Sequence, residues 1–294
     1  MKITLRIFAV LILLLSSLGA IEQEDRFVVH KDLVYSEVNG GLTLDLFLPD
    51  EMTEKVPCIL VIQGGGFRPQ NGQKFRPFAE YLVQHGYAAA LISYRGSPDH
   101  HYLDTVADTK AAVRFVRKVS KKYAIDSKRI GAMGRSAGGT LAGLLAVTGG
   151  MDTFEGKGDH SEYSSRIQAA VSFAGVFDLV ARFTDEEHIA LQPKVKTKVV
   201  SNGKWVGPAF SPDNNDWVQA SAITHVNKDD PPMLFLQCKD DTTVPWLQSQ
   251  EMYEAMKEVG VDVSLKYYEI GGHGFNKLGE QSLREIVKYF KEKL

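Results

Sequence analysis

The chain has 294 residues, 44% hydrophobic and 24% charged, which is the composition of an ordinary globular protein. This composition excludes a disordered chain, a collagen-like chain and a membrane protein with several spans. Lysine and arginine (34) nearly balance aspartate and glutamate (36), so the net charge of −2 gives no long-range field to attract nucleic acid or an anionic membrane. The two cysteines, Cys58 and Cys238, are too few for a disulfide scaffold or a thiolate zinc site, and we expect both to be buried and unlinked.

The first twenty residues differ from the rest of the chain. Lys2 and Arg6 precede an unbroken apolar run over residues 7–15, and small residues follow up to Ala20. This order is typical of a secretory signal peptide over residues 1–20. So short an apolar run cannot span ~30 Å of hydrocarbon, which disfavours the alternative of a permanent membrane anchor. We therefore expect an exported protein, cleaved after Gly19 or Ala20 and without stable membrane association after cleavage.

Residues 21–294 are predicted to form a single domain, because no repeat or low-complexity linker divides them. Two alternating strands come first, over residues 33–38 and 44–48, and the turn Asn39-Gly40-Gly41 between them predicts a β-hairpin. Short, continuously apolar strands then alternate with helical segments, which is the pattern of a parallel sheet covered on both faces. These strands are predicted over residues 58–62, 88–93, 130–133, 169–173, 233–237 and 263–268.

Helical periodicity fills several of the intervals. Apolar residues at i, i+3, i+4 and i+7 predict two amphipathic helices, with the stripes Ala112, Phe115, Val116, Val119 and Leu283, Ile286, Val287, Phe290. The longest interval, residues 181–222, has no clear period and is too long for a plain connection, so we expect a cap over the site. In such a sheet the loops at the carboxyl ends of the strands converge on one crevice, where we expect the chemistry.

One of these loops carries the segment GRSAGG at residues 134–139, between the strand predicted at 130–133 and a helix of small residues over 140–147. The pattern G-x-S-x-G in this context predicts a nucleophile elbow, a sharp strand-to-helix turn that exposes the serine Oγ. The turn forces close backbone contacts that glycine tolerates at the two flanking positions. Ser136 is therefore the candidate nucleophile.

A second glycine-rich segment, QGGGF at residues 63–67, follows the strand predicted at 58–62. Glycines expose their backbone N–H groups, and two of them, together with the N–H of Ala137, could face the oxygen that becomes negative when an ester carbonyl is attacked. The segment predicts an oxyanion hole, with a plain glycine-rich turn as the alternative.

A serine nucleophile needs a base, and position selects one of the eight histidines. His273 follows the last predicted strand and so lies on the same sheet edge as Ser136, whereas His225 precedes a strand. The orienting carboxylate is expected after the next-to-last strand, where Asp241 is preferred and Asp240 is the alternative. The chain order serine, aspartate, histidine is the one that this kind of sheet uses for nucleophile, acid and base.

Four side chains beside these loops are candidate substrate contacts. His100 and His101 follow the strand predicted at 88–93, and Phe67 follows the glycine run. Two adjacent histidines without a third ligand make a poor metal site, so no metal is predicted. Arg135, next to the nucleophile, is predicted either to steer an anionic substrate or to pair with a nearby carboxylate.

Several further segments resemble the α/β-hydrolase superfamily, and within it the secreted bacterial acetylxylan or feruloyl esterases (BD-FAE-like), which are related to the hormone-sensitive-lipase-like esterases. The resemblance covers about residues 30–290. The segments are ADTKAAVRF at 107–115, YAID at 123–126, SSRIQA at 164–169, ASAITHV at 220–226 and DDPP at 229–232.

The resemblance implies an α/β-hydrolase fold: a mostly parallel eight-stranded sheet with helices on both faces and a cap insertion. It also implies a serine esterase with the triad Ser136, Asp241 and His273 and no metal or organic cofactor. The oxyanion donors that it implies are Gly65, Gly66 and Ala137. The chain departs from the family at Gln63, where relatives carry the histidine of a His-Gly-Gly-Gly motif, and at Gln237-Cys238, where the acid loop usually has His-Gly.

The expected reaction is acyl transfer to water through an acyl-enzyme intermediate. The expected partner is a small ester or an acylated polysaccharide, with acetyl or feruloyl esters outside the cell as the favoured class and no nucleic acid partner. The alternatives are a general short-chain carboxylesterase, a peptidase of the prolyl-oligopeptidase kind and a non-catalytic binding protein on the same fold.

Overall fold

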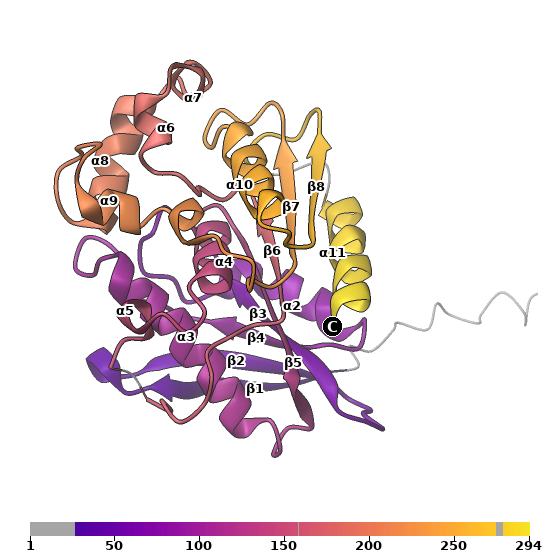
Figure 1. The fold of residues 1–294 in the computed structure, drawn as a ribbon. Coiled ribbons are helices and arrows are strands. Elements are labelled where there is room, and N and C mark those ends of the chain that lie inside the picture. Colours follow the sequence, from indigo (N-terminus) through magenta and orange to yellow (C-terminus); the bar gives the residue numbers. More distant parts are fainter. Residues whose placement is uncertain (1–26, 158, 275–278) are drawn as a thin grey trace, which may run out of the picture.

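A computed structural model describes residues 27–157, 159–274 and 279–294 of the chain (Figure 1), so the predicted signal peptide lies outside the described residues. In these ranges one eight-stranded sheet has the order β1-β2-β4-β3-β5-β6-β7-β8. β1 and β4 each pair antiparallel with β2, and all further neighbours in the sheet are parallel, as predicted. The strands are β1 (Phe27–Ser36), β2 (Leu42–Pro49), β3 (Val56–Ile62), β4 (Ala88–Ile92), β5 (Ile125–Arg135), β6 (Ala169–Phe173), β7 (Met233–Cys238) and β8 (Val263–Tyr268).

The structure differs from the strand predictions mainly at strand ends. β6 and β8 have the predicted bounds, but β5 begins at Ile125, five residues before the predicted start at Ile130. The added residues are mostly polar and partly exposed, so they carry no apolar pattern, although Ile125 still pairs with Val56 of β3. The predicted hairpin between β1 and β2 is confirmed, and its turn is a short 3-10 helix, η1 (Val38–Gly40).

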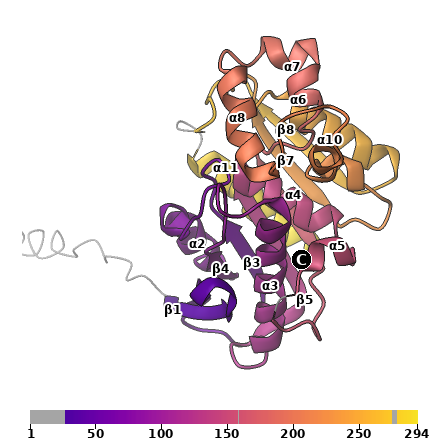
Figure 2. The ribbon, with the colours of Figure 1, turned by 90° about the vertical axis from the view of Figure 1, so that its left-hand side faces the viewer.

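Helices cover both faces of the sheet, with α2 and α3 on opposite sides of the strands (Figure 2). α3, α4 and α10 pack on the face that carries Leu60 and Ala132, and α2 and α11 pack on the face that carries Val61 and Met133. Because successive strand residues point to opposite faces, a strand buried on both sides is apolar throughout. These helices and the short α5 are α2 (Arg76–Val83), α3 (Tyr102–Val119), α4 (Ala137–Val147), α5 (Asp152–Glu155), α10 (Leu247–Glu258) and α11 (Gly279–Lys293).

Residues 181–222, predicted as a cap, contain four helices between β6 and β7, which we call the α6–α9 segment. In both views these helices gather at one end of the molecule (Figures 1 and 2). Trp205 and Trp217 of this segment are completely buried and join the core on the α3–α4 face. The helices are α6 (Ala181–Thr184), α7 (Glu186–Ala190), α8 (Val195–Val206) and α9 (Asn215–Gln219), followed by the 3-10 helix η3 (Ala222–His225).

The two cysteines are free and buried, as predicted. Cys58 lies on β3 and Cys238 on β7, and β5 and β6 separate these strands in the sheet. Over the described ranges, no helix combines the length and the apolar content that crossing a bilayer requires.

Candidate active site

Ser136 lies at the sharp turn between β5 and α4. Its φ of 56° and ψ of −126° are rare for a residue with a side chain. A Cβ on Gly134 would lie 2.2 Å from the carbonyl oxygen of Gly138, and a Cβ on Gly138 would lie 2.1 Å from that of Ile62. Both collisions are with backbone, so packing requires the two glycines that flank the serine. The N–H of Ser136 donates to the carbonyl of Phe173 (2.8 Å), which ties the turn to the end of β6.

Ser136, His273 and Asp241 come from three loops that follow β5, β8 and β7, and they lie in continuous hydrogen-bond contact. The Oγ of Ser136 is 2.8 Å from Nε2 of His273, and Nδ1 of His273 is 2.8 Å from Oδ2 of Asp241. Asp241 is 2% exposed, whereas the His273 side chain is 27% exposed, so the contacts run from the interior to the surface. This geometry allows the imidazole to accept the serine proton while the carboxylate orients the ring.

The loop after β7 fixes the orientation of Asp241. Its Oδ1 accepts the N–H groups of Thr243 (2.8 Å) and Val244 (3.0 Å), which leaves Oδ2 for His273. Gln237, one of the two departures from the family pattern, places its side-chain amide nitrogen 3.4 Å from Oδ2.

A buried arginine that the sequence analysis did not single out supports the same loop. Nη2 of Arg182, in α6, donates to the carbonyl of Thr243 (2.6 Å). Burial lowers the pKa of Arg182 to about 10, and the negative charge of Asp241 opposes this shift, so the guanidinium is charged at neutral pH. The interval 181–222 has no clear period, so no sequence signal pointed to this residue.

The neighbouring carboxylate, Asp240, does not contact the imidazole but holds the loop that carries it. It accepts the N–H groups of Gly271 (3.0 Å) and Gly272 (2.7 Å), just before His273. These two hydrogen bonds lower the pKa of Asp240. The structure therefore brings Asp241, the preferred candidate, to the histidine and leaves Asp240 as a support for the loop.

The glycine loop over residues 64–66 passes directly against the candidate nucleophile. A Cβ on Gly64 would lie 2.2 Å from the carbonyl oxygen of Arg135 and 3.1 Å from Cβ of Ser136. The N–H groups of the other two glycines, and that of Ala137 at the start of α4, donate to no acceptor in the described part of the chain. They are therefore available as donors to a ligand oxygen.

Gln63, the second departure from the family pattern, braces this loop from within. It is 2% exposed, and its Oε1 accepts the N–H of Lys74 (2.8 Å) while its Nε2 donates to the side chain of Gln70. Its backbone carbonyl accepts the hydroxyl of Tyr94 (2.5 Å). The glutamine side chain thus ties the start of the glycine loop to Gln70 and Lys74, which follow the loop in the chain.

Phe67, a predicted substrate contact, is 2% exposed and presents almost no side-chain surface. Its ring stacks on the indole of Trp205 with centroids 3.8 Å apart and planes at 9°. The indole Nε1 donates to the hydroxyl of Thr105 (3.1 Å) at the start of α3. Phe67 therefore joins the glycine loop to α8.

Arg135, predicted to bind an anion or to pair with a carboxylate, makes different contacts. Its Nη1 donates to the carbonyl of Gly274 (2.9 Å), and its guanidinium lies 5.2 Å from the ring centroid of Phe75. No carboxylate pairs with it among the described residues, and burial lowers its pKa. The contact with Gly274 holds the backbone next to His273.

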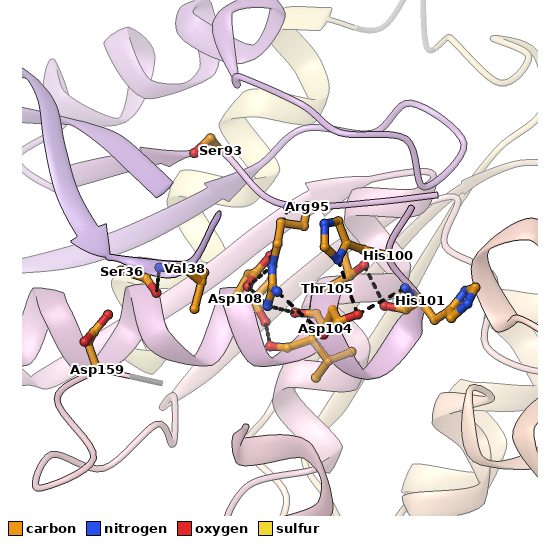
Figure 3. Close-up of polar contacts among 12 residues, drawn as sticks. Ser36, Val38, Ser93, Arg95, His100, His101, Asp104, Thr105, Asp108 and Asp159 are labelled. Carbon is orange, nitrogen blue, oxygen red and sulfur yellow. Dashed lines mark hydrogen bonds and ion pairs between the residues drawn. The ribbon is translucent and has the colours of Figure 1, made fainter. Parts of the chain in front are cut away.

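Figure 3 shows that His100 and His101 lie at the start of α3, next to Asp104. Nδ1 of His100 is 3.5 Å from Oδ2 of Asp104, and the backbone N–H of His101 donates to the same oxygen (3.4 Å). The ring of His101 faces Gly207, at the end of α8. A role of either histidine in binding substrate stays a prediction. Across the described ranges, no three His, Cys, Asp or Glu side chains form a group that could hold a metal ion.

Known proteins are similar to this chain over most of its length. Residues 44–256, more than two thirds of the chain, match the family model BD-FAE. The chain belongs to the BD-FAE family. This BD-FAE protein is 29% identical over 253 residues to "Probable carboxylic ester hydrolase LipM" of Mycobacterium tuberculosis, with 84% of this chain and 56% of the relative covered. It is 25% identical to the acetylxylan esterase of Xylanibacter ruminicola, with 86% and 48% covered.

Solved structures of esterases are also similar to this chain. The truncated form of a carbohydrate esterase from gut microbiota has a TM-score of 0.79 at 26% identity, with 92% of the BD-FAE protein and 98% of that chain covered. A butyrate-bound esterase, Est2 of Thermogutta terrifontis, has a TM-score of 0.73 at 27% identity, with 89% and 93% covered. These similarities confirm the α/β-hydrolase fold. The chain spans about half the length of the curated relatives it matches.

Proposed function

We propose that this BD-FAE protein is a serine hydrolase of carboxylic esters, with Ser136, His273 and Asp241 as its catalytic triad. The observation that carries the proposal is the unbroken chain of two 2.8 Å contacts from the Ser136 hydroxyl to the buried carboxylate. Family membership supports it, because the relatives include proteins named as ester hydrolases and esterases.

The mechanism is acyl transfer to water. His273 takes the proton from Ser136 as Oγ attacks the ester carbonyl, and Asp241 stabilises the imidazolium. The negative oxygen of the tetrahedral intermediate accepts hydrogen bonds from the N–H groups of Ala137 and the glycine loop, and each such donor typically contributes ~3 kcal/mol of transition-state stabilisation. His273 then protonates the leaving alcohol, and a water molecule repeats the cycle on the acyl-enzyme.

The substrates that we propose are acetyl or feruloyl esters of polysaccharides. Similarity to an acetylxylan esterase and to a carbohydrate esterase supports this class. Similarity to the butyrate-bound Est2 favours a second candidate class, simple short-chain esters. The α6–α9 segment is the cap in this proposal, since Trp205 and Arg182 connect it to the glycine loop and to the acid loop.

We also propose that the protein is exported, on the strength of the basic, apolar and small-residue regions in residues 1–20. Expression of the full chain, cell fractionation and N-terminal sequencing test this step. Recovery outside the cytoplasm with a new N-terminus near Ala20 supports it, and recovery in the cytoplasm with an intact N-terminus contradicts it.

The decisive test of activity is the hydrolysis of p-nitrophenyl acetate by the wild type and by Ser136→Ala. We expect activity that the substitution lowers by about 10⁴-fold or more, as for other serine nucleophiles. Product analysis on acetylated and feruloylated polysaccharides, beside simple aryl esters, then ranks the two substrate classes. Equal activity of wild type and variant would exclude Ser136 as the nucleophile, and no activity in either would favour a binding protein.

A further inference from the structure

A cavity of about 690 Å³ adjoins the glycine loop, and basic side chains form part of its wall. Its walls come from α8, the end of the glycine loop and the turn after β4, and its lining residues include four basic side chains and no acidic one: Arg68, Lys196, Lys198 and Lys204. The volume lies in the usual range of ligand sites, about 300–1,000 Å³. Because the whole chain carries a net charge of −2, this concentration of positive charge is local.

These cations have few partners within the described ranges, where Nε of Arg68 donates to the carbonyl of Gly65 (3.3 Å). No carboxylate pairs with any of the four basic side chains in the ranges that the structure describes. Lys194 and Lys196 also lie in or next to the first turn of α8, where the helix dipole disfavours positive charge, and this turn has no acidic residue. A local rule broken without structural compensation points to a functional site.

The cavity lies near the candidate active site. Gly66 forms part of its wall, and it stands two residues from Gly64, where a Cβ would lie 3.1 Å from Cβ of Ser136. Two residues span at most about 7 Å, so an ester held at Ser136 has only a short distance to reach into the cavity. The Trp205–Phe67 stack fixes α8 against this loop and so holds the cationic wall in place.

Lys198, in the wall of the cavity, lies near enough to the acid side of the triad for its charges to affect the pKa of this lysine. It is half-buried, and burial lowers its pKa, while Arg182 nearby acts in the same direction and Asp241 acts against it. Its ammonium group therefore lies within electrostatic reach of both. A carboxylate placed in the cavity would offset this repulsion between the two cations.

We propose that this cavity is a subsite for a carboxylate of the substrate, so that the protein prefers esters that carry an acidic group, such as acylated saccharides containing a uronic acid. This inference deepens the proposed esterase function and rests on it. Arg68 matches the geometry of a carboxylate, and the lysines add mobile point charges that attract it. The carboxylate can belong either to the alcohol part or to the acyl part of the ester.

The test compares matched pairs of esters that differ in one charge. For the alcohol side, the pair is p-acetoxybenzoate and its methyl ester. For the acyl side, it is p-nitrophenyl hydrogen succinate and its methyl ester. The variant is Lys196→Gln/Lys204→Gln, in which both altered side chains are exposed, and the control is Lys31→Gln/Lys291→Gln, which removes the same charge from exposed positions on β1 and α11.

We expect the ratio of kcat/KM for the charged ester to that for its neutral partner to fall about five- to tenfold in the cavity variant and to stay unchanged in the control. Raising the salt concentration to about 1 M should lower the wild-type ratio in the same way. The pair that responds identifies which part of the substrate carries the carboxylate. Ratios that are the same in wild type and cavity variant at low salt overturn the subsite.

A binding measurement separates this inference from the proposed function. Titration calorimetry of Ser136→Ala with digalacturonate should give a dissociation constant that rises at least about fivefold when Lys196→Gln/Lys204→Gln is added. Such a rise supports the subsite even if the wild type hydrolyses no ester, in which case only the esterase proposal fails. Equal affinity in both backgrounds, or binding in neither, contradicts the subsite even if neutral esters are hydrolysed.

Discussion

The contacts of Asp241 make an asparagine at this position a sharp test of the triad. Oδ1 accepts two backbone N–H groups, from Thr243 and Val244, and Oδ2 faces Nδ1 of His273. In Asp241→Asn the amide oxygen must take the place of Oδ1, because only an acceptor satisfies both N–H groups. The amide NH₂ then faces the imidazole.

This orientation forces the wrong tautomer on His273. Two donors cannot face each other, so Nδ1 becomes the acceptor and the ring proton moves to Nε2, which can no longer accept the proton of Ser136. Turning the amide round would leave two buried N–H groups without an acceptor, at about 1–3 kcal/mol for each group. We therefore expect kcat to fall about 10⁴-fold, which corresponds to about 5.4 kcal/mol in the activation free energy.

The assay is the hydrolysis of p-nitrophenyl acetate under saturating conditions, with the thermal unfolding of each variant as the check on folding. Asp240→Asn is the matched control, since an asparagine oxygen can still accept the N–H groups of Gly271 and Gly272. We expect this control to lose less than about tenfold in kcat. A folded Asp241→Asn protein within about tenfold of the wild type, or a larger loss in the control, would refute the assignment of the acid.

Three further predictions concern other parts of the site and the fold. Arg135→Gln removes a charge-assisted hydrogen bond to Gly274, so kcat for a neutral ester should fall about tenfold with little change in KM, and a change in KM alone contradicts this role. Gly64→Ala puts a Cβ 2.2 Å from a backbone oxygen and should lower kcat at least about 100-fold. Gly66→Ala is the control, because a Cβ at this position meets no atom within 4 Å and the positive φ of residue 66 should cost only about 1 kcal/mol of stability. Equal losses of kcat in the two variants would argue against the contact at Gly64. Burial raises the pKa of Asp230 to about 6, so the folded protein binds more protons than the unfolded chain between about pH 4 and 6 and its stability falls as the pH rises through this window. The Tm of the wild type minus the Tm of Asp230→Ala should therefore be more positive at about pH 4 than at about pH 8. The opposite trend would show that the charged carboxylate stabilises the fold.

The central part of the sheet was predictable because its strands are buried on both faces. Continuous apolar runs bounded by polar residues predicted the bounds of β6 and came within a residue or two for β3, β4 and β7. The bounds of β8 were also predicted, although this edge strand is only partly buried and carries Ser264 and Lys266 between its apolar residues. The start of β5 was missed because the pairing with β3 is interrupted between Ile125 and Ile130, and the residues 126–129 in this interval are polar and not fully buried.

The three side chains of the proposed triad were predictable for a related reason. Each one follows a strand, and the carboxyl ends of parallel strands share one edge, so sequence position alone fixed which residues could meet. The contact between Arg135 and Gly274 was not predictable, because it joins residues 139 positions apart through the packing of one loop against another. A local sequence pattern predicts where the backbone of a residue lies, but it does not predict which group the end of a long side chain contacts.

The α6–α9 segment was the least predictable part, and the cause lies in the composition of α8. Its fully buried side chains, Asn202, Trp205 and Val206, all lie near one end. Val195 and Val199 are only partly buried against the core, and lysines stand between these apolar residues, so the apolar stripe is weak. One large indole stacked on Phe67 supplies the anchoring that a stripe would otherwise provide. The same arrangement leaves Lys196 and Lys204 exposed on this helix. The lysines that interrupt the apolar pattern of α8 are therefore the same lysines that line the proposed subsite.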